Sequence, residues 1–403
     1  MSLSIRTDRL VAGGDAMGRD ENGRVVFVRG ALPGELVEVA LDVEKRDFAK
    51  GWAVAVVESS PDRVVPPCEH RLDGCGGCGW MHLTVEAQRH AKIEIVRESL
   101  RRIGRMDHDE VDRLVIPGGA VEPMRSRTSI RIVGDSERRP AFRREASDAT
   151  VDVRLCAIAH PNLDRVLGQL SIEPGTEVEL RTSVATGEIT ARWTGRSDGV
   201  VVGLPDDVRT GDRAWLVESV DGHDLRVSSA SFFQSSAEAA ALLVDAVRRA
   251  APELSAARHV LDAYGGVGLF GATAASGASQ VTVVESSRSS CFDAEHNLAG
   301  RDARVIRNEV GRWQADQGPA VDVVIADPPR SGLGKPGVAA LVGAAPAPII
   351  LVSCDPVSLA RDTWLLLENG YRPERIEVLD VFPQTRHVET VTRFTPPAPD
   401  VSP

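Results

Sequence analysis

The hydrophobic and polar positions along the chain follow three patterns in succession, and the first covers residues 1 to about 60. There, apolar residues alternate with polar ones in short runs such as GRVVFVRG and GWAVAVVES, separated by glycine-rich turns. Alternation with a period of two predicts strands with one buried face. We therefore predict a small OB-like β-barrel at residues 1–60, of the kind that often binds nucleic acid, although a generic β module would share the pattern.

Residues 61–225 combine a cysteine-rich stretch, one helix and a second set of strands. The stretch PPCEHRLDGCGGCGW comes first, a helical pattern follows from about 85 to 103, and strand patterns such as SRTSIRIVG and EVELRTSVATG begin near 115. These patterns predict a mostly β central domain. We expect the helix to pack on the domain that follows.

After about residue 226, strands and helices alternate. SSAEAAALLVDAVRRA has the spacing of an amphipathic helix, with Ser235 or Ser236 placed to cap it. The apolar strands include HVLDAY, QVTVVE, VDVVIAD and APIILVSC. This alternation predicts an α/β domain with a parallel, doubly wound, Rossmann-like sheet at residues 226–395. The proline-rich tail, 396–403, is predicted to be disordered.

Composition and charge narrow the class of protein only partly. A chain of 403 residues suggests two or three domains. No apolar run approaches the ~20 residues of a membrane span, and the first residues lack the features of a signal peptide. We therefore expect a cytoplasmic protein whose six cysteines are thiols, metal ligands or catalytic groups. The net charge of −11 argues mildly against nucleic-acid binding. The arginines cluster locally, however, as at Arg125, Arg127, Arg131, Arg138, Arg139, Arg143 and Arg144.

Two turns at strand ends have features typical of a site that binds a nucleotide-like cofactor. The sequence LDAYGGVG at 261–268 ends a strand with a glycine turn, and Glu285 ends the next strand, where it can accept hydrogen bonds from both ribose hydroxyls. The Gly-Gly-x-Gly spacing favours S-adenosylmethionine over NAD. Asp327-Pro328-Pro329-Arg330 follows another strand as a rigid turn. Methyltransferases that act on base amino groups have an aromatic residue in the place of Arg330, so that chemistry is disfavoured, and an ordinary proline turn is the alternative.

A cysteine and a glutamate suit chemistry at carbon 5 of a uracil. Cys354 follows the strand APIILV, and a helix is predicted to begin at Pro356, which favours a thiolate. Most lone cysteines beside a strand are small buried hydrophobes. A thiolate that adds to carbon 6 makes carbon 5 nucleophilic. Glu389 is the candidate base that removes the carbon 5 proton afterwards, and His387 is the second candidate.

Four cysteines have the spacing of metal ligands. Cys68, Cys75 and Cys78 lie close together and Cys156 lies far downstream. Such a four-thiolate site suits either zinc or an iron–sulfur cluster, and the spacing does not choose between them. A redox Cys-x-x-Cys motif is disfavoured because the flanking pattern is not β-α-β. Cys291 is left over, and we expect it to be buried.

Together these motifs resemble the RNA uracil-C5 methyltransferases of the TrmA and RumA type, over nearly the whole chain. The N-terminal module, with ALPGE and the hairpin before it, is similar to a TRAM domain, an RNA-binding barrel. The resemblance implies a class I methyltransferase domain at 226–395 with Cys354 as nucleophile and Glu389 as base. It implies a [4Fe-4S] cluster, in preference to zinc, at the four cysteines. It further implies S-adenosylmethionine contacts from Gln234, Tyr264, Gly266, Glu285 and Asp327.

The resemblance implies S-adenosylmethionine-dependent formation of 5-methyluridine in RNA, through a covalent adduct of Cys354 with carbon 6, by a monomer. We expect 23S ribosomal RNA as substrate, because the TRAM and cluster architecture resembles the ribosomal enzymes more closely. A tRNA T-loop uridine is the alternative. An RNA cytosine-C5 methyltransferase is disfavoured by Arg330, which occupies the region where those enzymes have a cysteine. A non-catalytic iron–sulfur RNA-binding factor is the alternative from another class.

The chain departs from the family pattern at several positions. The family often has cysteine at Gly265 and asparagine at Leu269, so one cofactor contact is expected to be lost. An aromatic residue is common at Met124, histidine at Asp148 and histidine at Gln384, and these changes are expected to alter how the target loop is held. None of them touches the nucleophile or the base.

Overall fold

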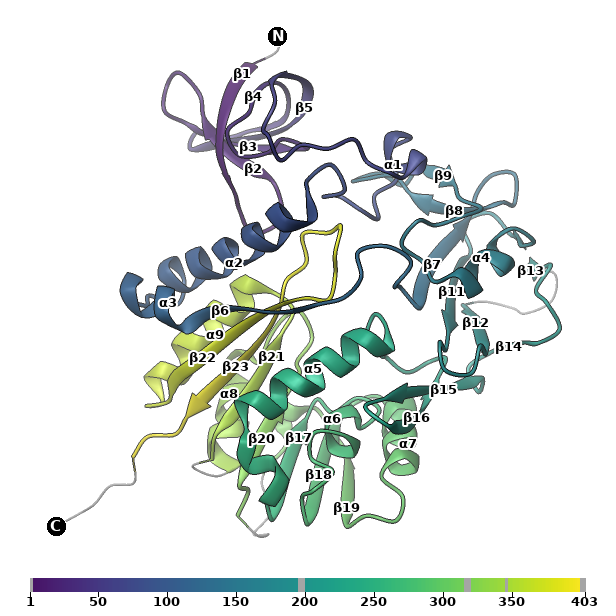
Figure 1. Cartoon of the computed structure of the whole chain (residues 1–403), viewed down its shortest axis with the longest axis vertical. Helices are drawn as coiled ribbons and strands as arrows, with labels where there is room; N and C mark the ends of the chain where they lie inside the picture. The colour runs from purple at the N-terminus through teal and green to yellow at the C-terminus, as the bar shows by residue number, and fades with distance from the viewer. Residues whose placement is uncertain (1–2, 195–199, 315–319, 345–346, 399–403) are drawn as a thin grey trace.

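The N-terminal strands form a closed five-stranded barrel. The structure is a computed structural model that describes residues 3–194, 200–314, 320–344 and 347–398 (Figure 1). The strands β1 (Leu3–Leu10), β2 (Ala16–Arg19), β3 (Val25–Arg29), β4 (Leu36–Glu44) and β5 (Phe48–Glu58) join in the order β1-β2-β3-β5-β4. Alternate residues such as Val26, Val28, Val37 and Val39 are fully buried inside it. This confirms the predicted barrel. Of the tail predicted to be disordered, residues 399–403 lie outside the described residues.

The central part is built on a six-stranded sheet with the order β14-β12-β11-β7-β8-β9. Its strands are β7 (Ser129–Gly134), β8 (Pro140–Arg143), β9 (Thr150–Asp152), β11 (Glu177–Thr182), β12 (Ile189–Trp193) and β14 (Val208–Thr210). Two short strands, β10 (Ser171–Ile172) and β13 (Val201–Val202), pair separately. The helix α4 (Pro161–Leu167) buries Leu163, Val166 and Leu167 against the six-stranded sheet. The short helix α1 (Glu69–Leu72) lies in the cysteine-rich stretch.

The C-terminal half contains an eight-stranded sheet with the order β19-β18-β17-β20-β21-β23-β22-β6. Its strands are β6 (Val115–Ala120), β17 (His259–Ala263), β18 (Gln280–Glu285), β19 (Ala303–Arg307), β20 (Val323–Ala326), β21 (Ile349–Ser353), β22 (Arg372–Asp380) and β23 (Glu389–Thr395). All are parallel except β23, which runs antiparallel to both neighbours. The predicted α/β sheet is confirmed, with one reversed strand.

Helices cover both faces of this sheet, as a doubly wound fold requires. One core contains α5 (Ala237–Ala250), α6 (Leu269–Ala272) and α7 (Arg288–Asn297), and the other contains α8 (Gly334–Ala344) and α9 (Pro356–Glu368). Strands covered on both faces are apolar throughout, and all five residues of β17 and of β21 are buried. No helix of the described ranges is long and apolar enough to cross a membrane.

Segments from before residue 226 also belong to this packing. The helix α2 (Val85–Arg102), predicted at 85–103, buries Val96 and Leu100 in the same core as Leu359 of α9, and α3 (His108–Leu114) follows it. The strand β6 extends the sheet at its edge. The hairpin β15 (Trp215–Val220) and β16 (His223–Ser228) packs on the α5 side, so the boundary predicted near 226 lies inside β16.

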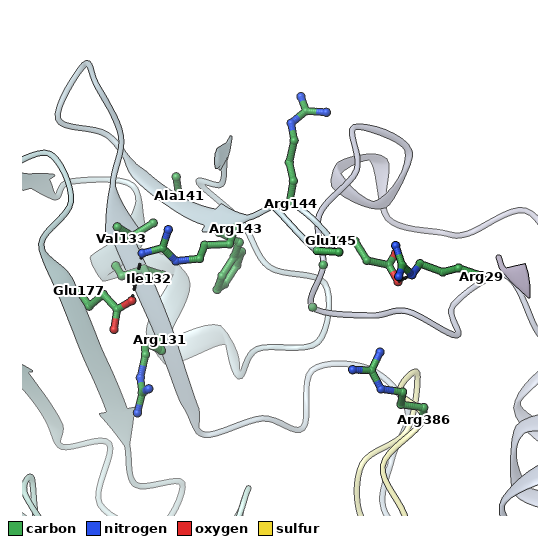
Figure 2. Close-up of a pocket in the computed structure, with 14 residues that line it drawn as sticks. Arg29, Arg131, Ile132, Val133, Ala141, Arg143, Arg144, Glu145, Glu177 and Arg386 are labelled. Carbon is green, nitrogen blue, oxygen red and sulfur yellow. Dashed lines mark hydrogen bonds and ion pairs between the residues drawn. The ribbon is translucent and has the colours of Figure 1, made fainter. Parts of the chain in front are cut away.

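The barrel, the central sheet and the loop between β22 and β23 meet around a surface cavity of about 450 Å³ (Figure 2). Arg29 reaches it from β3, Arg131 from β7, Arg143 from β8, and Arg386 from the loop. Gly76 and Gly77 of the cysteine-rich stretch also line it. Residues far apart in the sequence therefore share one surface.

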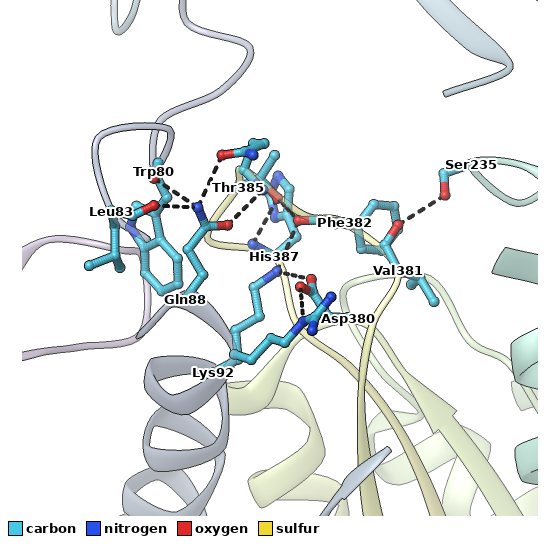
Figure 3. A network of polar contacts seen from close by, with 12 residues as sticks. Trp80, Leu83, Gln88, Lys92, Ser235, Asp380, Val381, Phe382, Thr385 and His387 are labelled. Carbon is cyan, nitrogen blue, oxygen red and sulfur yellow. Dashed lines mark hydrogen bonds and ion pairs between the residues drawn. The ribbon is translucent and has the colours of Figure 1, made fainter. Parts of the chain in front are cut away.

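The helix α2 holds the loop between β22 and β23 (Figure 3). The Lys92 ammonium donates to the Asp380 carboxylate at 2.6 Å and to the Phe382 carbonyl at 2.9 Å. One turn earlier, Gln88 donates to the Gln384 side chain at 3.0 Å and accepts from its backbone N–H at 2.7 Å. Since Lys92 and Asp380 are both buried, their charges compensate each other, and the half-exposed Arg89 adds a second positive charge near the carboxylate.

We expect Lys92→Met to lower the free energy of unfolding by about 3 to 5 kcal/mol, because it leaves the Asp380 carboxylate buried without its partner. Urea denaturation followed by circular dichroism measures the change. The matched control is Arg89→Met, since Arg89 lies 3.5 Å from the same carboxylate but is 46 % exposed, and it should cost less than about 1 kcal/mol. The double variant Lys92→Met/Asp380→Leu should recover most of the loss. Equal losses in Lys92→Met and Arg89→Met would contradict this account.

Candidate active site

A cavity of about 1040 Å³ lies at the carboxyl edge of the eight-stranded sheet. Parallel strands end at this edge, and the residues that follow them meet there. All seven residues predicted from the sequence for cofactor binding and catalysis line the cavity: Gln234, Tyr264, Gly266, Glu285, Asp327, Cys354 and Glu389. The structure therefore brings together residues that are spread over more than 150 positions of the sequence.

The turn after β17 gives a ligand close access to the backbone. Tyr264 and Gly266 have positive φ angles of 59° and 55°, and the Gly266 N–H donates to the Glu285 carboxylate at 3.1 Å. The same carboxylate accepts from the Ser287 N–H at 2.7 Å. These two contacts fix the orientation of Glu285 and leave lone pairs for ribose hydroxyls.

The departure from the family pattern at Gly265 has a steric reason in this chain. A Cβ atom at Gly265 would lie 2.7 Å from the Cγ1 atom of Val283 and 3.0 Å from the carboxyl carbon of Asp262. Asp262 is itself buried, and its carboxylate accepts from the Gly271 N–H at 2.9 Å. A side chain at 265 is therefore excluded unless Val283 moves. Leu269, the other departure in this region, lines the cavity as the first residue of α6.

Gln234 and Asp327 contact each other at the opposite wall. The Gln234 side chain donates to the Asp327 carboxylate at 3.1 Å. Burial raises the pKa of Asp327 to about 7, and the hydrogen bond from Gln234 opposes this shift. A buried carboxylate of this kind is stabilised by a positively charged ligand. Gln234 precedes α5, whose N-cap is Ser236, and Phe232 beside it is exposed.

Cys354 lies between β21 and α9, as predicted, and the helix begins at Pro356 with Asp355 as its N-cap. The predicted effect of the helix N-terminus, which favours a thiolate, is opposed by the surroundings of the thiol. Burial raises the pKa of Cys354 to about 12, and the nearby carboxyls of Glu389 and Asp327 add to the rise, while Arg330 opposes it. Burial and the two acidic neighbours outweigh the helix terminus, so the group is a thiol near neutral pH.

Glu389 is beside Cys354 because of strand pairing. Ser353, the last residue of β21, pairs with Thr390 of β23, and the Thr390 hydroxyl donates to the Ser353 carbonyl at 3.2 Å. Cys354 directly follows Ser353, and Glu389 directly precedes Thr390 as the first residue of β23. Burial and the proximity of Asp327 raise the pKa of Glu389 well above its usual value, and Arg330 opposes this. One carboxyl oxygen of Glu389 has no hydrogen-bond partner among the described residues, so it is available to a ligand.

His387, the second candidate base, faces a guanidinium. Nη2 of Arg330 lies 3.2 Å from Nε2 and 3.3 Å from Nδ1 of His387. Burial and this arginine lower the pKa of His387 to about 4, so its ring is neutral near pH 7. The ring centres of Phe382 and His387 lie 6.0 Å apart in an edge-on arrangement. The Arg127 guanidinium lies over the Phe382 ring, 5.7 Å from its centre. Phe382 and Arg127 were not predicted as site residues.

Two of the departures from the family pattern contact each other. The side-chain amide of Gln384 donates to the Met124 sulfur at 3.8 Å, and the backbone carbonyl of Gln384 accepts from the backbone N–H of Trp80 at 3.0 Å. Gln384 has a positive φ of 65° and is buried. Gln384, which stands where the family often has histidine, is therefore held by contacts with Gln88 and Met124. These contacts were not predicted from the sequence. Asp148 is exposed and lies 3.2 Å from Arg143.

The four cysteines predicted as metal ligands line one cavity of about 260 Å³. Burial raises the pKa of Cys78 to about 12, and the proximity of Cys156, Cys75 and Cys68 contributes. Among the described residues, no group of three or more His, Cys, Asp or Glu side chains is arranged to hold a metal ion. Cys291 is buried, as predicted, and its thiol donates to the Glu285 carbonyl at 3.3 Å.

Two family profiles match parts of the chain. Residues 7–54 match the TRAM domain, and residues 317–394 match the tRNA (Uracil-5-)-methyltransferase family. The second match contains the Asp327 turn and the segments of Cys354 and Glu389.

Comparisons over the full length agree. The chain is 33 % identical to an RNA methyltransferase of Streptomyces avermitilis, over 96 % of each chain. It is 32 % identical to the 23S rRNA (uracil(1939)-C(5))-methyltransferase RlmD of Chromohalobacter salexigens, over 98 % of this chain and 90 % of that one. The crystal structure of the Pyrococcus abyssi tRNA (uracil-54, C5)-methyltransferase with S-adenosyl-L-homocysteine has the same fold, with a TM-score of 0.73 at 24 % identity over 98 % and 99 % of the chains. The chain therefore belongs to the RNA uracil-C5 methyltransferase family.

Proposed function

We propose that this chain transfers the methyl group of S-adenosylmethionine to carbon 5 of a uridine in RNA, with Cys354 as nucleophile and Glu389 as base. The observation that carries the proposal is the placement of Cys354, directly after β21, beside Glu389 at the start of the paired strand β23, within the cavity that Gln234, Tyr264 and Asp327 also line. A thiol and a carboxyl on one side of a substrate base are what this chemistry needs.

The cofactor contacts follow from the polarity of the walls. Glu285, which lines the cavity and is held by the Gly266 N–H, would accept hydrogen bonds from the ribose hydroxyls, and Gly266 would let the cofactor approach the backbone. When bound, S-adenosylmethionine supplies an electrophilic methyl group on a positively charged sulfur. The carboxyls of Asp327 and Glu389 raise the pKa of Cys354. The positive charge of the bound cofactor would oppose their effect and so favour the thiolate when both substrates are in place.

The target uridine enters the cavity out of its stack, because its ring faces are otherwise covered. The Cys354 sulfur, as the thiolate, then bonds to carbon 6. The electron pair displaced onto carbon 5 would take the methyl group from the cofactor sulfur, whose bond to that methyl breaks and which is left as a neutral thioether. Glu389 removes the remaining proton from carbon 5, the carbon–sulfur bond breaks, and the thiolate is released. Arg330 and His387 lie beside this region. The His387 ring is neutral, so the positive charge near the developing enolate comes from Arg330.

We expect Cys354→Ala to abolish 5-methyluridine formation and Glu389→Gln to accumulate a covalent protein–RNA adduct, because only the release step needs the base. The measurements are methyl transfer from labelled cofactor and the shift of the protein–RNA band on a denaturing gel. Binding of S-adenosylmethionine by both variants, measured by calorimetry, controls for folding. Substantial turnover by Cys354→Ala, or no adduct with Glu389→Gln, would contradict the assigned roles.

We propose 23S ribosomal RNA as the substrate, in the cytoplasm and with the enzyme as a monomer. The 32 % identity to the Chromohalobacter 23S rRNA enzyme over nearly the full length supports this choice. A tRNA uridine is the second candidate, supported by the family profile over residues 317–394. A non-catalytic RNA-binding factor would not require the juxtaposition of Cys354 and Glu389, and it would lack cofactor binding.

A map of 5-methyluridine in ribosomal and transfer RNA from a deletion strain and its parent tests the substrate. We expect one 23S site to lose its methyl group completely, and a plasmid copy to restore it while the Cys354→Ala plasmid does not. Loss of a tRNA site alone would move the assignment to tRNA. If both maps stay unchanged and purified protein methylates neither RNA, the proposal is wrong.

We further propose that Cys68, Cys75, Cys78 and Cys156 hold a [4Fe-4S] cluster. The four thiols come from segments about 80 residues apart and face one cavity. Burial and the neighbouring sulfurs raise the pKa of Cys78, so thiolates here need a compensating positive charge, which bound iron would supply. Methyl transfer needs no electron transfer, so the cluster is assigned to holding this segment, which continues to Trp80 and the loop contact at Gln384.

We expect anaerobically purified protein to contain iron and acid-labile sulfide in about equal amounts, with a broad visible absorption band. Cys78→Ser should lose most of both, whereas Cys291→Ser, a buried cysteine outside the cavity, should keep them. Zinc without sulfide would contradict the cluster.

A further inference from the structure

The 450 Å³ cavity between the barrel, the central sheet and the β22–β23 loop has no role in the proposed chemistry. Five arginines line it, Arg29, Arg131, Arg143, Arg144 and Arg386, together with the two glutamates Glu145 and Glu177 (Figure 2). We refer to it as the arginine cavity. Such an excess of positive charge in a chain with a net charge of −11 is a local feature that folding alone does not explain.

Three of the five guanidinium groups make no hydrogen bond or ion pair within the described ranges, although the charge of one of them, Arg386, acts on the Asp15 carboxyl. Of the other two, Arg29 lies 3.9 Å from Glu145. Arg143 lies 3.2 Å from Asp148 and 3.3 Å from Glu177, and Glu145 is paired with Arg71 at 2.7 Å. Over the described ranges, no hydrogen bond or ion pair is made by the side chains that remain, Arg131, Arg144 and Arg386. Like charges gathered in this way repel one another, and an anionic ligand would relieve the repulsion.

The side chain of Arg386 is held at the arginine cavity by its close contact with Gly14 of the barrel. A Cβ atom at Gly14 would lie 2.6 Å from Cδ of Arg386, and Gly14 has a φ of +90°, so the arginine stem lies where only a glycine leaves room. The Gly14 carbonyl also accepts from the Trp80 indole at 3.0 Å. The barrel therefore fixes the side chain that immediately precedes His387.

The arginine cavity and the catalytic cavity share a wall. Arg131 lines both, and the β22–β23 loop contributes Arg386 to the first and His387 to the second. A ligand that spans this wall would place anionic groups in the arginine cavity and a nucleobase in the catalytic cavity. A polynucleotide has this construction, because each base is attached to a backbone with one negative charge per phosphate.

We propose that the arginine cavity binds backbone phosphates of the RNA next to the target uridine, with Arg144 and Arg386 as ligands and Arg131 at the passage into the catalytic cavity. The proposal rests on the proposed RNA-methylating function. Arginine suits phosphate because its planar fork donates two parallel hydrogen bonds. An acidic peptide would satisfy the charges, but it would leave the connection to the catalytic cavity without a purpose. Phosphate contacts at Arg386 would also stabilise the loop that leads to Glu389.

The test is RNA binding by Arg144→Gln/Arg386→Gln, followed by fluorescence anisotropy with a labelled uridine-containing RNA hairpin over a series of potassium chloride concentrations. We expect the dissociation constant to rise roughly tenfold or more at low salt. We also expect a smaller slope in the plot of the logarithm of the dissociation constant against the logarithm of the salt concentration. Each lost phosphate contact should lower the slope by about 0.7, so two lost contacts should lower it by about 1.4. Cofactor affinity should not change.

Two matched variants separate charge, geometry and folding. Arg113→Gln/Arg213→Gln removes two exposed arginines that line none of the three cavities, and it should leave the salt slope nearly unchanged. Arg144→Lys/Arg386→Lys keeps the charges but not the forks, so it should keep the slope and lose part of the affinity. A series of RNAs with one neutral methylphosphonate linkage each should weaken binding to the natural protein near the target uridine, and the Gln variant should be insensitive to the same linkages.

The outcomes distinguish the two proposals. An unchanged salt slope in the Gln variant, with the natural protein forming 5-methyluridine, overturns the phosphate site alone. Loss of slope in that variant, with no methylation by the natural protein, overturns the proposed function and leaves an RNA-binding surface. Polyglutamate that binds the natural protein as tightly as the hairpin, and is lost in the Gln variant, would assign the arginine cavity to an acidic polypeptide and overturn the proposal.

Discussion

The buried contact between Lys92 and Asp380 is the constraint on which the rest of the site depends. Neither charge can remain in an apolar interior alone, so α2 has to lie across the carboxyl end of β22 for the chain to fold. Because Lys92 also binds the Phe382 carbonyl and Gln88 binds Gln384, the same helix determines the path of the following loop. A segment from before the central domain thereby positions residues of the last strand.

The reversed strand β23 explains how a base comes to the edge where the cofactor binds. In a parallel sheet the carboxyl ends of the strands meet at one edge, so residues after each strand, such as Asp327 and Cys354, line it. A further parallel strand would contribute its last residue in the same way. Since β23 is antiparallel, its first residue, Glu389, lies at that edge instead. The loop before β23 then passes over the cavity, and His387 lines it.

Much of the fold and the candidate site could be predicted from the sequence, because both depend on local pattern. Strand periodicity and the motifs at strand ends were sufficient to group Glu285, Asp327 and Cys354 at one edge. The raised pKa of Cys354 was not predicted, since it depends on burial and on Glu389 and Asp327, whose proximity only the tertiary structure shows. The pairing of β6 with β22, and the contacts of Lys92, join segments more than 200 residues apart with no local signal.

Different local charge distributions on the two sides of the β22–β23 loop reconcile an acidic chain with an RNA substrate. The catalytic cavity gathers Asp327, Glu389 and a thiol whose pKa those carboxyls raise, a surrounding that stabilises a cationic cofactor. The arginine cavity gathers five guanidinium groups, which would stabilise a polyanion. The net charge of −11 averages over both and describes neither. Since the loop between them is held by α2 and by Gly14 of the barrel, the separation of the two fields is a property of the fold.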